Sequence, residues 1–171
     1  PYKLIKNVKG IGFLKADEIA LKNNLDKNSP YRIESAILYV LTQKAINFGH
    51  VYYPKEKLTN EVSKLIGVET ELIEPVYMNL LLSSEVVIDN SFEESNIYLD
   101  YLYVSESYIA SKLAKMALND DFKILFDIEK EIKEAIKSLS IKLSKIQIDA
   151  IKSCFEENIS IITGGPGTGK T

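Results

Sequence analysis

Hydrophobic positions recur at helical spacing on both sides of two glycines near the start of the chain. The apolar residues before the glycines are Leu4, Ile5 and Val8, and those after them are Ala16, Ile19 and Ala20. Each group fits one face of a short helix. Gly10 and Gly12 stand between the two groups, where a sharp reversal needs glycine. The pattern predicts a helix, a tight turn and a second helix over residues 1–28.

A longer helix and a shorter one are predicted next. Ser29 and Pro30 give a cap followed by a first-turn proline, and Gly49 ends the helix that they begin. Residues 54–66 repeat the helical spacing, and Gly67 closes that helix. The inward face of this second helix is predicted to comprise Leu58, Val62, Leu65 and Ile66.

A third helix and two strands complete this region. Thr70 has the character of a helix cap, but Pro75 lacks an N–H, so the third helix either kinks at the proline or begins near it. Residues 86–88 and 97–103 are rich in β-branched and aromatic side chains and predict two strands joined by a polar turn. Three helices followed by a hairpin are typical of a winged helix. Residues 29–104 are therefore predicted to form a winged-helix-like domain.

Residues 105–140 are predicted to be helices that link two domains. The side chains expected to face inward are Phe122, Leu125, Phe126, Ile132 and Ile136. Two pairs of opposite charge at i, i+4 spacing, Glu129 with Lys133 and Lys130 with Glu134, indicate the exposed face. Packing is the expected role of this segment.

Composition limits the chemistry that the chain can perform. The 171 residues are 46% hydrophobic, carry a formal net charge of -3 and include one cysteine and one histidine. A core can form, a disulfide framework is excluded, and Cys154 and His50 are not expected to hold zinc. No apolar run approaches the roughly 18 residues of a membrane span, and no leader precedes the first helix, so we expect a cytoplasmic protein. Any DNA contact must come from a local patch.

The final residues, ISIITGGPGTGKT, hold the most specific motif in the chain. An apolar, β-branched run that predicts a strand leads into the GxxxxGK[ST] spacing of a phosphate-binding loop. Glycines let backbone N–H groups turn inward around a phosphate without Cβ clashes. In this scheme Lys170 brings charge to the terminal phosphates and the Thr171 hydroxyl holds Mg²⁺. The predicted ATP-binding loop comprises Gly164, Gly165, Gly167, Thr168, Gly169, Lys170 and Thr171.

Gln147, on a helix predicted just before this loop, is a second candidate nucleotide-binding residue. LSKIQIDAI, which contains Gln147, resembles the adenine-reading motif of superfamily 1 helicases, and TGGPGTGKT resembles their first ATPase motif. The resemblance implies that Gln147 hydrogen-bonds the adenine edge. It also implies that residues 141–171 are the first helix and strand of an α/β RecA-like ATPase domain. For Gln147 taken alone, a surface position on a helix is the alternative.

The N-terminal glycine pair, in VKGIGFLKADEIA, is similar to the helix-hairpin-helix elements of DNA-binding proteins. Such a turn exposes N–H groups at the start of the second helix, where amides and helix dipole together can hold a DNA phosphate. A valine at Gly12 is expected to fill the space of that phosphate and to strain the turn. A purely structural hairpin is the alternative. The predicted DNA-binding residues are Lys9, Gly10, Gly12 and Lys15.

Charge separates this region from the predicted hairpin. Residues 1–25 contain five lysines against two acidic residues. Residues 85–106 contain six acidic residues and no lysine or arginine. Because like charges repel, the hairpin is not expected to grip a phosphate backbone, and a scaffold or protein-contact role is predicted for it.

The order of the motifs along the chain indicates a family. GIGFLKADEIA, SPYRIESAILYVL and GHVYYPKEKL, followed by the two ATPase motifs, resemble the N-terminal region of RecD-like helicases, relatives of the exonuclease V alpha subunit. The resemblance implies a DNA helicase of recombination or repair that uses ATP and magnesium. It would move 5′ to 3′ on single-stranded DNA and bind single strands or junctions without sequence preference. The expected fold is mostly α with a small β-hairpin.

Two other functions fit parts of the pattern. A hexameric AAA-type ATPase also has PGTGKT, and a non-enzymatic DNA-binding module could carry a vestigial loop. Because the sequence stops inside the motif, we expect the 171 residues alone to bind DNA weakly, to hold no cofactor and to lack ATPase activity. Lys170 and Thr171 would then be catalytic only in a longer parent protein.

Overall fold

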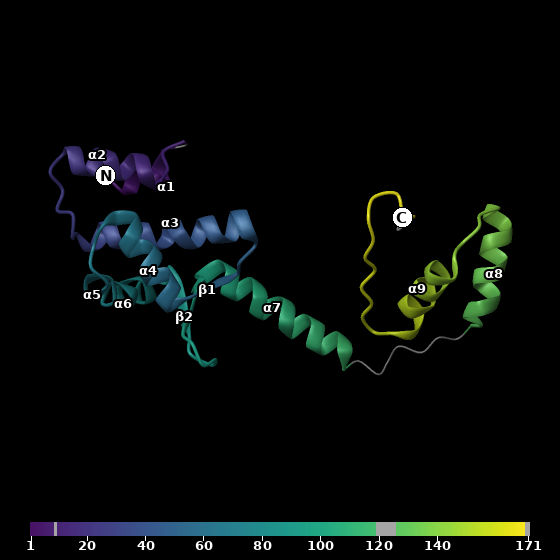
Figure 1. The fold of residues 1–171 in the computed structure, drawn as a ribbon. Coiled ribbons are helices and arrows are strands. Elements are labelled where there is room, and N and C mark those ends of the chain that lie inside the picture. Colours follow the sequence, from purple (N-terminus) through teal and green to yellow (C-terminus); the bar gives the residue numbers. More distant parts are fainter. Residues whose placement is uncertain (9, 119–125, 170–171) are drawn as a thin grey trace. The chain divides into compact units, whose positions relative to one another are not determined.

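The computed structural model describes residues 1–8, 10–118 and 126–169, which fall into two compact units (Figure 1). The first unit is Pro1–Ser107 and the second is Tyr108–Thr171. Helices dominate both, and the described strands belong to the first. The prediction of a mostly helical chain is therefore confirmed, whereas the predicted hairpin is part of a three-stranded sheet.

The first unit starts with two short helices and a long one and then alternates helices with short strands. Its elements are α1 (Lys3–Asn7), α2 (Phe13–Lys22), α3 (Pro30–Phe48), β1 (Tyr52–Pro54), α4 (Lys55–Ile66), α5 (Thr70–Ile73), α6 (Val76–Leu82), β2 (Val86–Asp89), β3 (Asn96–Leu99) and the start of α7 (Asp100–Ala117). The sheet is antiparallel with the order β1-β3-β2, so that Tyr52 of β1 and Val87 of β2 both lie opposite Tyr98.

The hydrophobic core of the first unit is built around α3. Ile33 and Ile37 of this helix are fully buried, together with Phe13 of α2, Leu58 of α4 and Ile97 of β3. α3 contacts α2, α4, α6 and the sheet. Since α2 contributes to the same core, the glycine turn in front of α2 is fixed relative to the rest of the unit.

The helix boundaries predicted from capping residues are confirmed. α3 begins at Pro30 with Ser29 as its N-cap and ends at Gly49, whose φ is 71°. α4 ends at Gly67, whose φ is 64°, and begins at Lys55, one residue later than predicted. Glycine accepts this left-handed conformation at helix C-termini without strain.

The interruption predicted at Pro75 is confirmed, and two other details of the second and third predicted helices are wrong. The third helix is divided at Pro75 into α5 and α6, because the proline cannot donate the N–H that a continuous helix needs. Glu69, not Thr70, is the N-cap of α5. On α4, Leu65 is exposed and Thr59 is buried in its place, since the hydroxyl of Thr59 hydrogen-bonds within the unit and can enter the core.

The strands also differ from prediction. Tyr52–Pro54 forms a strand that was not predicted. Three residues are too few to show the alternation of a strand, and proline argues against one. The strand predicted over 97–103 ends at Leu99, and α7 begins at Asp100, whose carboxylate suits a helix N-terminus. The identity of residues 29–104 as a winged-helix-like domain stays a prediction.

The second unit consists of most of α7 followed by two short helices. α8 spans Ile128–Leu139, and α9 spans Lys145–Glu156. Ile132 of α8, 8% exposed, is the one buried hydrophobic side chain in the part of this unit that the structure describes. The rings of Phe126 and Phe155 meet edge to face, with centroids 5.8 Å apart. Few apolar contacts therefore hold this unit together.

The charge pairs predicted on α8 are confirmed in part. Lys130 and Glu134 approach to 3.9 Å as expected. Glu129 pairs with Lys152 of α9 at 2.5 Å, and not with Lys133 as predicted. Glu129 pairs with Lys152 because α9 packs against α8 and brings this lysine to the carboxylate.

The inward face predicted for the linking helices is partly wrong. Ile132 is buried and Ile136 half-buried, as expected, but Phe126 is exposed. Phe122 and Leu125 lie outside the described residues. The spacing of hydrophobic residues predicted which side of α8 faces inward. Spacing alone does not report how much of the rest of the protein packs against that side.

The strand predicted before the phosphate-binding loop does not form. Residues 157–165 have no regular structure, and Ile161 is 86% exposed. A strand of a parallel sheet needs neighbouring strands to pair with, and in the described parts of the chain none lies against this segment. The assignment of residues 141–171 to a RecA-like domain stays a prediction.

Candidate DNA-binding turn and nucleotide-binding loop

The turn between α1 and α2 is organised by backbone hydrogen bonds and one glycine. The Val8 N–H donates to the Leu4 carbonyl at 2.9 Å, and the Ile11 N–H donates to the Val8 carbonyl at 3.2 Å. Gly10 has a φ of 90°, which disfavours any side chain. Gly12 has a φ of -86°, which any residue adopts. The strain predicted at Gly12 is therefore wrong, and the constraint lies at Gly10.

Gly12 leaves the N-terminus of α2 open. It is the N-cap of α2, and its carbonyl accepts from the Ala16 N–H at 3.1 Å. The N–H groups of the first helical turn have no acceptor within the helix, and the helix dipole places positive charge there. Gly12 is exposed, and a Cβ at this position would meet nothing within 4 Å. An anion such as a phosphate can therefore approach these amides.

The lysines near the turn differ in their surroundings. Lys15 lies in the first turns of α2 with its side chain exposed, and Lys3 of α1 is also exposed. Lys22 forms an exposed ion pair with Glu18 at 2.6 Å. Lys9, predicted to bind DNA, lies outside the described residues. Of the predicted DNA-binding residues, the structure thus brings Gly10, Gly12 and Lys15 to one end of α2.

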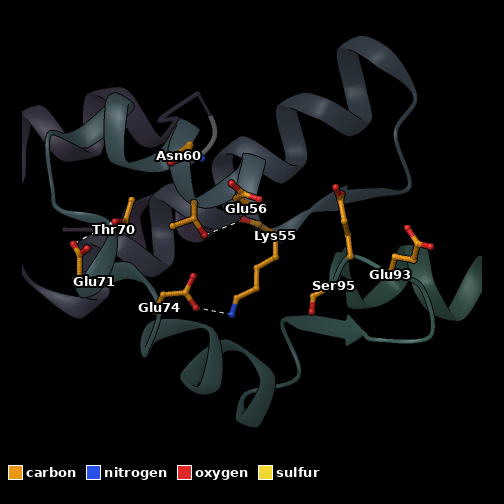
Figure 2. Close-up of a pocket in the computed structure, with 10 residues that line it drawn as sticks. Lys55, Glu56, Asn60, Thr70, Glu71, Glu74, Glu93 and Ser95 are labelled. Atoms are coloured by element: carbon orange, nitrogen blue, oxygen red, sulfur yellow. Dashed lines mark hydrogen bonds and ion pairs between the residues drawn. The ribbon is translucent and has the colours of Figure 1, made fainter.

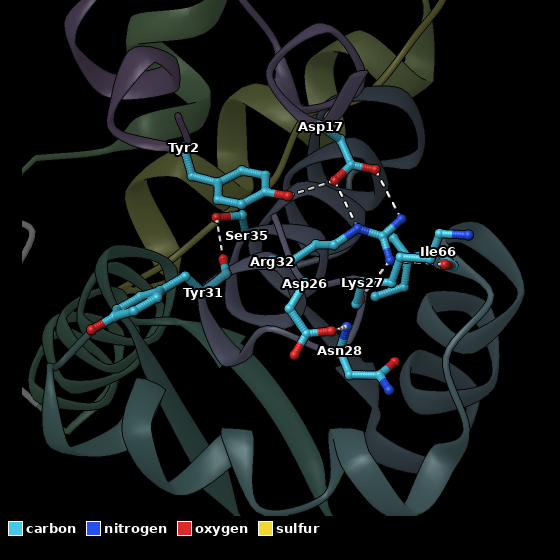
Figure 3. A network of polar contacts seen from close by, with 9 residues as sticks. All are labelled: Tyr2, Asp17, Asp26, Lys27, Asn28, Tyr31, Arg32, Ser35 and Ile66. Atoms are coloured by element: carbon cyan, nitrogen blue, oxygen red, sulfur yellow. Dashed lines mark hydrogen bonds and ion pairs between the residues drawn. The ribbon is translucent and has the colours of Figure 1, made fainter. Parts of the chain in front are cut away.

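A buried arginine fastens this region to the rest of the unit (Figure 3). Arg32 of α3 is 4% exposed, and its Nε and Nη2 donate to the two carboxylate oxygens of Asp17 at 2.8 and 3.0 Å. Its Nη1 donates to the carbonyls of Lys27 and Ile66 at 2.8 and 3.0 Å. The Tyr2 hydroxyl donates to Asp17 at 2.5 Å. One guanidinium therefore joins α2, α3 and the end of α4.

The same network controls the charge of Asp17. Burial acts to raise the pKa of this carboxyl, but hydrogen bonds from Arg32 and Tyr2 and the arginine charge outweigh burial, so the pKa is lowered. Asp17 stays ionised and is compensated by Arg32. Sequence reasoning assigned no role to Arg32. The available signal was an arginine at helical spacing from Ala36 and Val40 in an otherwise apolar stripe.

A second surface of the first unit is acidic. A hollow of about 510 Å³ lies beside the β2–β3 hairpin (Figure 2). The carboxylates that line it are Glu56, Glu71, Glu74, Glu93 and Glu94. Lys55 also lines it and forms an ion pair with Glu74 at 2.5 Å. Such a surface repels a phosphate backbone, in agreement with the charge pattern of the sequence.

In the second unit, the glycine-rich loop adopts a conformation suited to phosphate. Gly167 and Gly169 have φ values of 76° and 74°, and Thr168 lies between them. The Thr168 hydroxyl donates to the Gly165 carbonyl at 2.9 Å. Left-handed residues alternating with others turn backbone N–H groups toward a common concavity, which is the arrangement that binds phosphate.

Gln147 connects the start of α9 to this loop. Its Oε1 accepts from the Ser144 N–H at 2.8 Å, and the Ser144 hydroxyl accepts from the Gln147 N–H at 3.3 Å, so the two residues form a capping box. Its Nε2 donates to the Thr168 carbonyl at 3.2 Å. A Cβ at Gly169 would lie 2.8 Å from this Nε2. The predicted adenine-reading residue and the predicted phosphate loop are therefore in contact.

The described part of this loop fits phosphate groups, because a glycine turn of this kind presents N–H groups that suit phosphate oxygens. Gln147 lies beside the turn, and both ends of its amide are hydrogen-bonded, to Ser144 and Thr168. Lys170 and Thr171, the predicted catalytic residues, with Thr171 also the predicted magnesium ligand, lie outside the described residues. In the described ranges, no group of three or more potential ligands gathers into a metal site, and no helix is long and apolar enough to cross a membrane.

Comparison with known proteins agrees with this geometry. The family model of the ATP-dependent RecD2 DNA helicase HHH domain matches residues 1–52. The ATP-dependent RecD2 DNA helicase of Deinococcus radiodurans is 25% identical over 98% of this chain. This chain is similar to the N-terminal region of RecD-like helicases. The resemblance inferred from the sequence is confirmed. The chain spans about a quarter (24%) of the length of that relative.

The RecD-like match falls on the elements that form the turn. Residues 1–52 contain α1, α2 and the whole of α3, and thus Gly10, Gly12 and Arg32. The helix-hairpin-helix prediction for the start of the chain is supported by both the fold and the match. The match also joins α3 to the hairpin, which agrees with the shared core and the Arg32 network.

Proposed function

We propose that this chain is the N-terminal part of an ATP-dependent DNA helicase of the RecD-like kind. The observation that carries the proposal is the similarity to an ATP-dependent RecD2 DNA helicase over 98% of the chain. The proposed enzyme binds single-stranded DNA or a junction, moves 5′ to 3′ and serves recombination or repair. These finer properties are those that the sequence motifs imply.

The proposed DNA contact is the N-terminus of α2. Amides of its first turn, with Gly12 leaving them open, would hold one or two phosphates, and Lys15 would add charge. Because such contacts touch only the backbone, binding is expected to be blind to sequence. The acidic hollow beside the hairpin would face away from the DNA.

The proposed nucleotide site is the loop bonded to Gln147. Its glycines and Thr168 would surround the phosphates, Lys170 would bring charge, and Thr171 would hold magnesium. When bound, ATP would supply the free energy for strand separation through transfer of its terminal phosphoryl group to water. Both ends of the Gln147 amide are engaged, with Ser144 and Thr168. Reading an adenine edge would therefore require Gln147 to exchange one of these partners, which links adenine binding to the position of the loop.

The test uses the full-length protein and strand-separation assays. We expect ATP hydrolysis that single-stranded DNA stimulates, and unwinding of duplexes with a 5′ overhang but not of those with a 3′ overhang. Lys170→Ala should abolish both activities, because the positive charge that would stabilise the transferring phosphoryl group is lost. Lys142→Ala, an exposed lysine before α9, is the control and should change neither. DNA binding without DNA-stimulated hydrolysis would favour the non-enzymatic alternative.

A further inference from the structure

The first unit contains a cleft beside the glycine turn that the proposed phosphate contact does not use. Its volume is about 590 Å³, within the range of small-molecule sites. Its lining includes Tyr2 at the start of α1, Gly12 and Phe13 at the start of α2, Tyr39 of α3 and Tyr101 in the first turn of α7. The cleft therefore opens next to the N-terminus of α2.

One wall of the cleft is a row of stacked aromatic rings. Tyr2 and Phe13 stack with centroids 6.2 Å apart and planes 17° apart, and Phe13 and Tyr39 stack at 5.2 Å and 28°. The Tyr2 hydroxyl is engaged by Asp17, so Tyr2 offers its ring to the cleft. Tyr101 of α7 also lines the cleft and is 59% exposed. Nearly parallel rings and one more exposed ring in the same lining suit a flat aromatic ligand.

The polar residues of the cleft select the kind of ligand. Four uncharged side chains line the cleft, Ser35, Thr42, Gln43 and Ser84. The Ser35 and Thr42 hydroxyls donate to the Tyr31 and Leu38 carbonyls, so toward the edge of a nucleobase they can act only as acceptors, whereas the amide nitrogen of Gln43 can donate. Glu85 and Asp100 also line the cleft, and their carboxylates disfavour a phosphate inside it. A nucleotide would therefore place its base in the cleft and its phosphate outside.

We propose that this cleft holds one unpaired base of single-stranded DNA whose phosphate is bound at Gly12. The inference rests on the proposed DNA contact at this turn and extends it. Gly12 lines the cleft and is also the N-cap of α2, so the two halves of one nucleotide meet adjacent features. A paired base in a duplex is stacked and cannot enter, so the cleft distinguishes single strands from duplex.

The test compares DNA with and without bases. The probes are a fluorescent single-stranded oligonucleotide and one of the same length whose central nucleotides are abasic, titrated with the full chain by anisotropy. Stacking of a single base predicts that the abasic probe binds about fivefold more weakly, or worse. Tyr101→Ala should remove most of that difference and leave binding to a duplex unchanged. Tyr31→Ala changes a tyrosine outside the cleft that is even more exposed, at 72%, and should keep the difference.

The outcomes separate this inference from the proposed function. Equal affinity for the two probes overturns the base site, as does a difference that Tyr101→Ala leaves intact, and the cleft would then serve another ligand such as a peptide. If Gly12→Val weakens both probes to the same extent while Tyr101→Ala has no effect, the phosphate contact stands and the base site fails. If Gly12→Val has no effect on either probe, the proposed contact itself fails.

Discussion

The two units of this chain hold their candidate sites in different ways. In the first unit, α2, α3, α4 and the sheet share one core, and the turn before α2 is fastened by a buried ion pair. In the second unit, Ile132 is the one buried hydrophobic residue among those described, while Leu118, Ile146 and Ile161 are more than 80% exposed. The turn is thus positioned by packing, and the glycine-rich loop by a few polar contacts around Gln147.

This difference predicts where mutations will matter. Contacts that fasten the turn lie in a core and should change global stability when they are removed. Contacts that fasten the loop lie near the surface, where solvent competes for the same hydrogen bonds, and should change local order.

The largest effect is expected from removing the buried arginine. Arg32→Ala removes a buried guanidinium and leaves the half-buried Asp17 without its partner, which should lower the free energy of unfolding by about 3–5 kcal/mol. The exposed pair of Lys22 and Glu18 provides the contrast, and Lys22→Ala should have little effect. Urea denaturation followed by circular dichroism measures both. Equal midpoints for the two variants would show that the network does not hold the turn.

The next largest effect is the loss of stability when a buried isoleucine of each unit is replaced by alanine. Ile37→Ala opens a cavity in the first core and should cost about 2–5 kcal/mol. Ile132→Ala, in a unit with few apolar neighbours, should cost clearly less. Hydrogen exchange read by mass spectrometry should show slow exchange in α3 and fast exchange in α9. Similar protection of the two helices would contradict the contrast between the units.

A smaller effect concerns alkaline pH. Burial raises the pKa of Tyr77 from 10.0 to about 12, with Thr59 opposing through a hydrogen bond and Glu74 adding to the rise. The folded state therefore resists ionisation. The protonated Tyr77 contributes to the free energy of unfolding on the order of 2 kcal/mol. This contribution is complete below pH 10 and is lost as the pH rises through 12.

Tyr77→Phe tests this pH dependence. The variant should lose the hydroxyl contact with Thr59, about 1 kcal/mol at neutral pH, and should show a shallower fall in stability above pH 10. Tyr98, whose pKa burial also raises to about 12, should account for part of the remaining slope. Tyr31→Phe, which changes an exposed tyrosine, is the control. An unchanged slope in Tyr77→Phe would argue against a buried, protonated Tyr77.

Sequence reasoning predicted the helices of the first unit because their signals are local. Ser29, Pro30, Gly49 and Gly67 act within one or two turns, and the structure follows them. The strand β1 and the end of β3 depend on pairing with residues far along the chain, which periodicity does not report. Those boundaries were therefore missed.

The candidate sites were predicted unevenly for the same reason. Motif spacing indicated Gly10 and Gly12, which the structure places in the turn before α2, and Gln147, which it places against the glycine-rich loop; their roles in binding stay predictions. It did not predict Arg32, whose role depends on Asp17 lying opposite it after folding. It also placed the strain at Gly12, whereas the backbone dihedrals place it at Gly10.

The salt dependence of DNA binding tests the central claim, that the N-terminus of α2 holds DNA phosphate, most directly. Anisotropy titrations of a labelled single strand should give a slope of log K against log salt of about -0.7 to -1.4, as for one or two phosphates. Gly12→Val, which the backbone tolerates, should weaken binding by about tenfold or more while the circular dichroism spectrum is kept. Lys15→Ala should reduce the slope, and Glu93→Ala with Glu94→Ala should leave binding unchanged or slightly tighter. A folded Gly12→Val variant that binds DNA as well as the original chain would contradict the claim.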